Sequence, residues 1–318
     1  MLTRFPVIVG PTAGGKTALA IGVAQRIGEL TGRVGEVVSA DSMQVFRGMD
    51  IGTAKPTIEE RGEIPHHLID IVEPTESFSV DRWLGLAEPL IESLRGEGIT
   101  PVVVGGTHLY AKALLEGMFE GPEPNEALRA EIAAMEPNER RRWLEEVDPV
   151  SAQRLHRNDH RRTIRALEVY RATGQPISEL QQQWDQNRPR PDALLVGLEW
   201  ESEAINRRIN ARVRQMVEQG LVEEVRGLWQ AGRLGPQASQ ALGYKQIVAH
   251  FEGRCSLEEA VEATKIETRR FAKNQRTWLR RLRMTPGSVW FRGEDATSGI
   301  WAQSIVDKML MDHGRRGL

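Results

Sequence analysis

The stretch Gly10-Pro11-Thr12-Ala13-Gly14-Gly15-Lys16-Thr17 decides the fold of this chain. It follows the apolar, strand-like run Phe5–Val9 and precedes a helix-like segment at residues 18–29, the setting that the pattern G-x-x-x-x-G-K-[ST] requires. Glycines let backbone N–H groups turn inward around phosphate oxygens, and the positive end of the next helix points to the same place. Lys16 adds a charge, and Thr17 adds a hydroxyl ligand for Mg²⁺. We therefore predict a phosphate site at residues 10–17, in preference to a plain glycine-rich turn.

Length and composition limit the class of protein. The 318 residues suffice for one large domain or two ordinary ones. A net charge of −2 is not that of a polycation, so any nucleic-acid surface needs local segregation of charge. Cys255 is the only cysteine, which excludes an internal disulfide and favours the cytoplasm. No apolar stretch is long enough to cross a membrane, and residues 1–10 do not resemble a signal peptide, so we expect no membrane partner.

The first third of the chain alternates between two patterns. The strand-like runs are residues 5–9, 36–40, 67–72 and 101–104, and the helix-like segments between them include residues 18–29 and 81–95. Such alternation predicts an α/β fold with a parallel sheet that helices cover on both faces. Ligands of such sheets gather beyond the carboxyl ends of the strands.

The pattern changes near residue 121. Residues 121–183 are helical in pattern, breaker clusters lie at residues 120–125 and 185–191, and a strand-like run resumes at 193–198. We predict a P-loop NTPase-like core of residues 1–120 and 192–318, with an all-helical domain inserted at residues 121–191. The alternative is a helical excursion that packs rigidly on the core.

Polar groups follow the second predicted strand, in Asp41-Ser42-Met43-Gln44. In a parallel sheet Asp41 emerges at the same edge as residues 10–17. A carboxylate there can accept a proton from a nucleophile or help to hold Mg²⁺. The alternative is a turn or a helix cap at the strand end, but Ser42 and Gln44 favour a functional site.

The fourth strand leads into Gly105-Gly106-Thr107, which allows close backbone approach and offers a hydroxyl. This strand lacks the terminal acid with which a hydrolysing ATPase holds Mg²⁺ and water, and Asp70 is the only nearby substitute. The sequence therefore disfavours a motor or a GTPase-like protein.

A long basic helix is predicted from Ser256, which forms a capping box with Glu259, to a point before Pro286. Between residues 264 and 283 there are eight basic residues and one acid. The residues that fall within about 80° of one another on a helical wheel are Lys265, Arg269, Lys273, Arg276, Arg280 and Arg283. No acid interleaves at i+4 within the segment, so a polyanion track is favoured over a solvated face of ion pairs.

In this order, the motifs resemble those of the tRNA dimethylallyltransferases (tRNA isopentenyltransferases), and the resemblance covers nearly the whole chain. The matching segments are residues 10–17, 41–44, 49–56, 66–68, 105–107, 165–169, 243–245 and 271–273, with Gln275, Thr277 and Trp278. The departures are Phe46, where the family usually has Tyr, and Asn274, where Arg is usual.

The resemblance implies a reaction. A dimethylallyl group would pass from dimethylallyl diphosphate to N6 of the adenosine 3′-adjacent to the anticodon of tRNA, and pyrophosphate would leave. Residues 10–17 would hold the leaving diphosphate, with Lys16, Thr17 and Mg²⁺ stabilising its charge. Asp41 would take the N6 proton, and Arg212 matches an arginine expected near the diphosphate.

The resemblance and the basic helix also imply a tRNA-binding surface. Its residues would be Asp41, Ser42, Met43, Gln44, Thr107, Arg129, Arg161, Arg162, Thr163, Ile164, Arg165, Lys273, Arg276 and Arg280. Two other functions share part of the pattern: a P-loop small-molecule kinase of the nucleoside-kinase type, and a nucleotide-gated RNA-binding protein without chemistry. The basic helix disfavours the first and Asp41 the second. We expect a cytoplasmic monomer.

Overall fold

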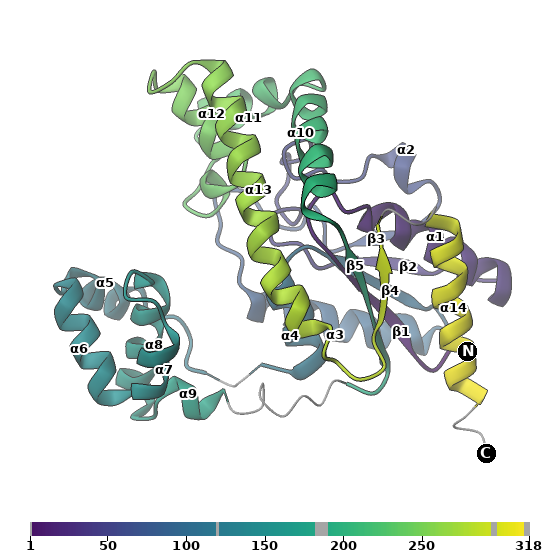
Figure 1. The fold of residues 1–318 in the computed structure, drawn as a ribbon, viewed down its shortest axis with the longest axis horizontal. Coiled ribbons are helices and arrows are strands. Elements are labelled where there is room, and N and C mark those ends of the chain that lie inside the picture. The colour runs from purple at the N-terminus through teal and green to yellow at the C-terminus, as the bar shows by residue number, and fades with distance from the viewer. Residues whose placement is uncertain (1, 119–120, 182–189, 294–297, 315–318) are drawn as a thin grey trace. The chain divides into compact units, whose positions relative to one another are not determined.

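A parallel sheet forms the centre of the fold in the computed structural model, which describes residues 2–118, 121–181, 190–293 and 298–314 (Figure 1). Within these residues the sheet has six strands in the order β3-β2-β4-β1-β5-β6. The strands are β1 (Phe5–Val9), β2 (Glu36–Ser39), β3 (His66–His67), β4 (Pro101–Gly105), β5 (Ala193–Glu199) and β6 (Val289–Arg292). Every neighbouring pair is parallel, so all the carboxyl ends meet at one edge. The predicted α/β class is confirmed.

Helices cover both faces of this sheet. They are α1 (Lys16–Thr31), α2 (Ile58–Arg61), α3 (Val80–Gly96), α4 (His108–Glu116), α10 (Ser202–Glu218), α11 (Leu221–Gln230), α12 (Tyr244–Phe251), α13 (Leu257–Leu282) and α14 (Ser298–Gly314). Successive residues of β1 point into two different cores: Ile8 lies with Leu19 of α1, whereas Val7 lies with Trp83 of α3. Burial on both faces explains why β1 is apolar throughout rather than alternating.

The edge strand β3 is shorter than the sequence indicates. The run at residues 67–72 predicts a full strand, but only His66 and His67 pair with β2. Leu68 (φ 59°) and Asp70 (φ 56°) take left-handed backbone conformations that break a strand ladder. The Asp70 carboxylate lies 2.5 Å from the buried amine of Lys55, an ion pair that the strand pattern does not encode.

The long helix α13 begins and ends where the sequence indicates. Ser256 and Glu259 form the predicted capping box, and the helix ends at Leu282, before Pro286. Thr285 follows with its amide bonded to the Leu282 carbonyl. The helix contacts α10 and α12, so its cations lie above the part of the core that follows β5 (Figure 1). No helix in the described ranges is long and apolar enough to span a bilayer.

Contacts divide the chain into two units, residues 1–115 with 189–318 and residues 116–188, where the sequence suggests an insertion at 121–191. The described residues of the second unit contain helices and no strand. These helices are α5 (Glu126–Ala134), α6 (Pro137–Val147), α7 (Pro149–Arg154), α8 (His160–Thr173) and α9 (Ile177–Leu180). Ile132, Leu144 and Leu167 centre a core of their own. In the first unit, the Arg190 amide donates to the Leu115 carbonyl at 2.7 Å, so the two chain connections leave it at one place.

Candidate active site

The loop between β1 and α1 has the geometry of an anion cradle. Ala13 (φ 59°) and Gly15 (φ 86°) are left-handed, and the Gly14 amide donates to the Pro11 carbonyl at 3.1 Å. Gly15 is the N-cap of α1 and has no side chain to bond the first amides of the helix. The Lys16 and Thr17 amides therefore point out of the positive end of a helix of 16 residues. An anion can accept from them directly.

Two side chains from the far end of β5 hold this loop from outside. The Trp200 indole donates to the Gly14 carbonyl at 3.1 Å, and Arg208 Nε donates to the Ala13 carbonyl at 2.8 Å. The Arg208 guanidinium also stacks over the Trp200 ring at 4.6 Å from its centroid. Sequence reasoning missed both residues. Trp200 follows a strand, so the strand-end rule that selected Asp41 could have selected it too.

Asp41 lies beside the loop, as predicted, because β2 and β1 both flank β4. Its Oδ1 accepts from the amides of Met43 (2.9 Å) and Gln44 (3.3 Å). Its Oδ2 turns elsewhere: a Cβ built on Gly106 would lie 3.7 Å from Asp41 Oδ2 and 3.6 Å from Lys16 Nζ. The carboxylate and the amine thus approach one point at the edge of the sheet. Thr107 is tied to the same turn, since its Oγ1 accepts from the Ser42 amide at 3.0 Å.

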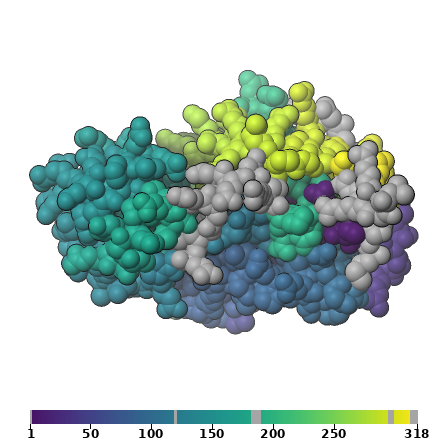
Figure 2. Space-filling view, turned by 90° about the horizontal axis from the view of Figure 1, so that it is seen from below, coloured from purple at the N-terminus to yellow at the C-terminus, as the bar shows by residue number. Residues whose placement is uncertain are grey.

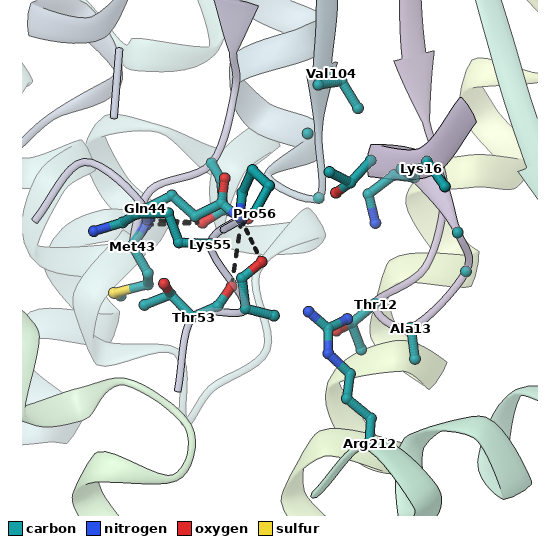
Figure 3. Close-up of a pocket in the computed structure, with 18 of the residues that line it drawn as sticks. Thr12, Ala13, Lys16, Met43, Gln44, Thr53, Lys55, Pro56, Val104 and Arg212 are labelled. Carbon is teal, nitrogen blue, oxygen red and sulfur yellow. Dashed lines mark hydrogen bonds between the residues drawn. The ribbon is translucent and has the colours of Figure 1, made fainter. Parts of the chain in front are cut away.

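Positive charge accumulates on one side of the site. Lys16 Nζ donates to the Pro11 carbonyl at 2.8 Å. Burial, and then the neighbouring Arg212, lower the pKa of Lys16 to about 8, with Asp41 acting in the opposite direction. Burial also lowers the pKa of Arg212. Figure 3 shows both side chains pointing into one cavity, opposite Gln44 and Thr53. Two crowded cations beside one carboxylate form a site that an anion would stabilise.

The cavity has a volume of about 1850 Å³, and every residue that lines it belongs to the first unit. The predicted site residues on its wall are Thr12, Ala13, Gly14, Gly15, Lys16, Thr17, Asp41, Ser42, Met43, Gln44, Thr107 and Arg212. Apolar groups, among them Ile51, Val213 and Met216, line the same space. Gln44 is fixed by bonds from Nε2 to the carbonyls of Thr53 (3.3 Å) and Ala54 (3.2 Å). The cavity can therefore hold an anion and a short hydrocarbon together.

The basic face of α13 is only partly open. Lys265 pairs with Glu262 at 3.0 Å, Arg269 donates to Asn210 at 2.6 Å, Arg276 donates to Ser202, and Arg283 pairs with Glu199. Lys273 and Arg280 are exposed. The C-terminal part of the helix, in yellow-green, lies on the surface in Figure 2. The ion-pair alternative thus describes part of this face, and the exposed cations remain for a polyanion.

In the second unit, the predicted cations have two different environments. Arg129 and Arg165 both bond the carboxylate of Glu168, at 3.1 and 2.7 Å. Burial raises the pKa of Glu168, but hydrogen bonds from Arg165, the Asn125 amide and Arg129 outweigh it and lower the pKa overall. Arg161 and Arg162 are exposed.

The residues between these cations are turned inward. Thr163 is buried, and Ile164 packs against the core of the unit. Arg129 and Arg165 therefore hold the unit together, whereas Arg161 and Arg162 are open to a ligand.

The family model described as IPP transferase matches residues 44–282 of this chain. The chain belongs to the IPP transferase family. A tRNA dimethylallyltransferase of Geobacillus kaustophilus is 48% identical over 285 residues, 88% of each chain. One of Shouchella clausii is 46% identical and covers 98% of this chain and 99% of its own length.

Solved structures of relatives agree with this assignment to the IPP transferases. The full-length tRNA isopentenylpyrophosphate transferase of Bacillus halodurans is 38% identical, with a TM-score of 0.71, over 99% of this chain and 100% of its own. A eukaryotic dimethylallyltransferase crystallised while acting on tRNA is 29% identical, with a TM-score of 0.77, over 92% of this chain and 74% of its own.

Proposed function

We propose that this IPP transferase moves a dimethylallyl group from dimethylallyl diphosphate to N6 of the adenosine 3′-adjacent to the anticodon of a tRNA and releases pyrophosphate. The observation that carries the proposal is the approach of Lys16 Nζ and Asp41 Oδ2 to one point at the mouth of the anion cradle. Reaction class and RNA substrate are supported by family membership and by the names of the relatives, tRNA dimethylallyltransferases.

The chemistry follows from where the groups lie. The diphosphate lies in the loop of residues 10–17, against the amides at the start of α1. The C1–O bond breaks while the N6–C1 bond forms, and the electron pair of the broken bond stays on the diphosphate. Lys16 and Arg212 stabilise that charge in a partly buried site, where electrostatic interactions are strong. Asp41 Oδ2 takes the proton that N6 loses.

The residues present also suit Mg²⁺. The ion usually takes one or two oxygens from protein and the rest from water and substrate phosphates. The described residues hold no cluster of three or more His, Cys, Asp or Glu side chains for a metal. The Thr17 hydroxyl would hold the ion at the start of α1, with diphosphate oxygens completing the shell. Bound there, Mg²⁺ supplies charge neutralisation for the leaving group.

The RNA meets the protein through three groups of residues. An extruded adenine, which costs a few kcal/mol to unstack, faces Ser42, Met43, Gln44 and Thr107. Phosphates lie near Lys273, Arg276 and Arg280 of α13, and near Arg161 and Arg162 of α8. One chain supplies all the reacting groups, so we propose a monomer that acts in the cytoplasm.

The direct test is incubation with unmodified anticodon stem-loop RNA, Mg²⁺ and dimethylallyl diphosphate, followed by mass analysis of the nuclease-digested RNA. We expect one C5H8 unit on the adenosine next to the anticodon. RNA in which purine riboside replaces that adenosine lacks N6 and should remain unmodified. Turnover of ATP without modification of RNA would instead indicate the kinase.

A further inference from the structure

The side-chain amide of Gln275 joins the two loops that carry the reacting groups. Gln275 lies on α13 and is 3% exposed. Its Oε1 accepts from the Thr12 amide at 2.8 Å, and its Nε2 donates to the Gly106 carbonyl at 2.9 Å. The two bonded loops follow β1 and β4, neighbouring strands of the sheet. An amide is planar and rigid, so bonds at both ends fix the spacing of the loops.

These bonds have two consequences for the cradle. The Thr12 amide is committed to Gln275, so among the cradle's described amides it is those of Ala13, Gly15, Lys16 and Thr17 that can face a diphosphate. Gly106 also sits where three groups meet. A Cβ built there would lie 3.3 Å from Gln275 Nε2, 3.6 Å from Lys16 Nζ and 3.7 Å from Asp41 Oδ2. A shift of Gly106 against the loop therefore changes the distance between Lys16 and Asp41.

We propose that Gln275 is a positioning residue for the transfer reaction. Both polar ends of its side chain are bonded to protein backbone, so it acts through the Thr12 amide and the Gly106 carbonyl rather than on the substrate. The inference rests on the proposed function, because it assumes that residues 10–17 bind a diphosphate. Misplacement of reacting groups by about 1 Å can cost on the order of 100-fold in rate.

The test uses Mg²⁺-pyrophosphate as the probe, measured by calorimetry on the full chain. Gln275→Met keeps the volume and loses both hydrogen bonds. Gln237→Met is the matched control, since Gln237 accepts from the Phe78 amide at 2.8 Å and donates to the Phe78 carbonyl at 3.1 Å. Gln237 does not line the cavity within the described residues. Both variants lose two bonds to backbone, but only one loses the link between the loops.

We expect Gln275→Met to bind pyrophosphate at least about tenfold more weakly and to transfer the prenyl group about 10- to 100-fold more slowly in kcat. Gln237→Met should match the wild type in both measurements while losing thermal stability to a similar degree. If Gln275→Met retains wild-type pyrophosphate affinity and kcat, the inference is wrong. If the wild-type protein itself binds no pyrophosphate, the proposed function is wrong instead.

Gln275→Glu adds a readout that a purely structural role would not change. The carboxylate still accepts from Thr12 but repels the Gly106 carbonyl, whereas the protonated acid can donate to it. We therefore expect the affinity deficit against wild type, measured at each pH, to narrow as the pH falls from 7 to about 5. A deficit that is constant with pH would contradict the assigned bond to Gly106.

Discussion

Asp41 serves two purposes through its two oxygens. Sequence reasoning treated a strand-end cap and a catalytic carboxylate as alternatives, yet Oδ1 caps the turn at Met43 and Gln44 while Oδ2 faces Gly106. The cap fixes the carboxylate in the direction that proton transfer requires. Asp41 and Lys16 could be placed together from the sequence because parallel strands bring their carboxyl ends to one edge.

Gln275, Trp200 and Arg208 could not be placed in this way. Gln275 is 263 residues from Thr12 in the sequence, and it reaches Thr12 only through the packing of α13 over the core. Trp200 and Arg208 likewise meet the loop only after β5 pairs with β1. Local patterns carry no record of such long-range contacts, so motif residues are predictable while the residues that support them are not.

Lys16 makes binding of diphosphate dependent on pH. Its pKa is lowered from 10.5 to about 8, mainly by burial, so the free protein loses this charge as the pH rises through 8. We expect pyrophosphate affinity to fall above about pH 8, as followed by calorimetry between pH 7 and 10. Lys16→Arg should lack this fall, since guanidinium stays charged. An identical fall in both proteins would assign the titration to the ligand.

The same lowered pKa affects folding with a definite sign. A Lys whose folded pKa lies below its unfolded value costs stability while both states are charged, which holds below pH 8. The cost fades as the pH rises from 8 to 10.5. Bound diphosphate removes the cost at neutral pH, so ligand binding and folding are linked at this residue.

At the scale of elements, one carboxylate from α11 anchors the loop that faces the P-loop across the cavity. Glu224 accepts from the amides of Asp50 (2.9 Å), Ile51 (2.7 Å) and Gly52 (3.1 Å), and from the hydroxyl of Tyr244. The loop continues to Thr53, whose carbonyl holds Gln44. The anchor thus positions a proposed RNA-binding residue from a distance.

We predict that Glu224→Gln lowers the free energy of unfolding by about 2 kcal/mol, because its NH2 group must face backbone donors. Chemical denaturation measures this change, and cleavage at residues 50–56 by limited proteolysis should become faster. The exposed neighbour Glu223 gives the control, since Glu223→Gln should stay within about 0.5 kcal/mol of wild type. Equal stability of both variants would refute the anchor.

The helix α13 offers a second test. Lys273 and Arg280 are exposed, whereas Lys265 is paired with Glu262. We predict that Lys273→Gln and Arg280→Gln each weaken binding of anticodon stem-loop RNA several-fold and reduce the slope of log K against log salt by about one. Lys265→Gln should change the slope little. Slopes unchanged in all three variants would remove α13 from the RNA interface.

The edge of the sheet shows where pattern reasoning ends. The run at residues 67–72 is apolar and β-branched enough for a strand, yet the ion pair between Lys55 and Asp70 and the left-handed Leu68 end β3 after His67. The other strand runs of the core, buried on both faces, were predicted within one or two residues. Burial leaves a clear trace in composition, whereas a single ion pair does not.

At the scale of the whole molecule, two units carry separate tasks. All residues that line the cavity lie in residues 1–115 and 189–318, while the helical unit has its own core. The Arg190 amide bonds the Leu115 carbonyl at 2.7 Å, so a short Gly-Ser linker can replace residues 116–189. We predict that this variant keeps pyrophosphate affinity within a few-fold, by calorimetry, but loses most of its RNA affinity. Equal loss of both would show that the units are not independent.

The most direct test of the central claim is a single-turnover reaction with excess enzyme, RNA and dimethylallyl diphosphate, which measures pyrophosphate released and dimethylallyl gained by RNA. For the wild type the account predicts one pyrophosphate for each dimethylallyl group. For Asp41→Asn, which keeps the Oδ1 acceptor but cannot take the N6 proton, it predicts almost none of either at nearly unchanged RNA affinity. Transfer by Asp41→Asn at a rate near that of wild type, or pyrophosphate released without modification of RNA, would contradict the account.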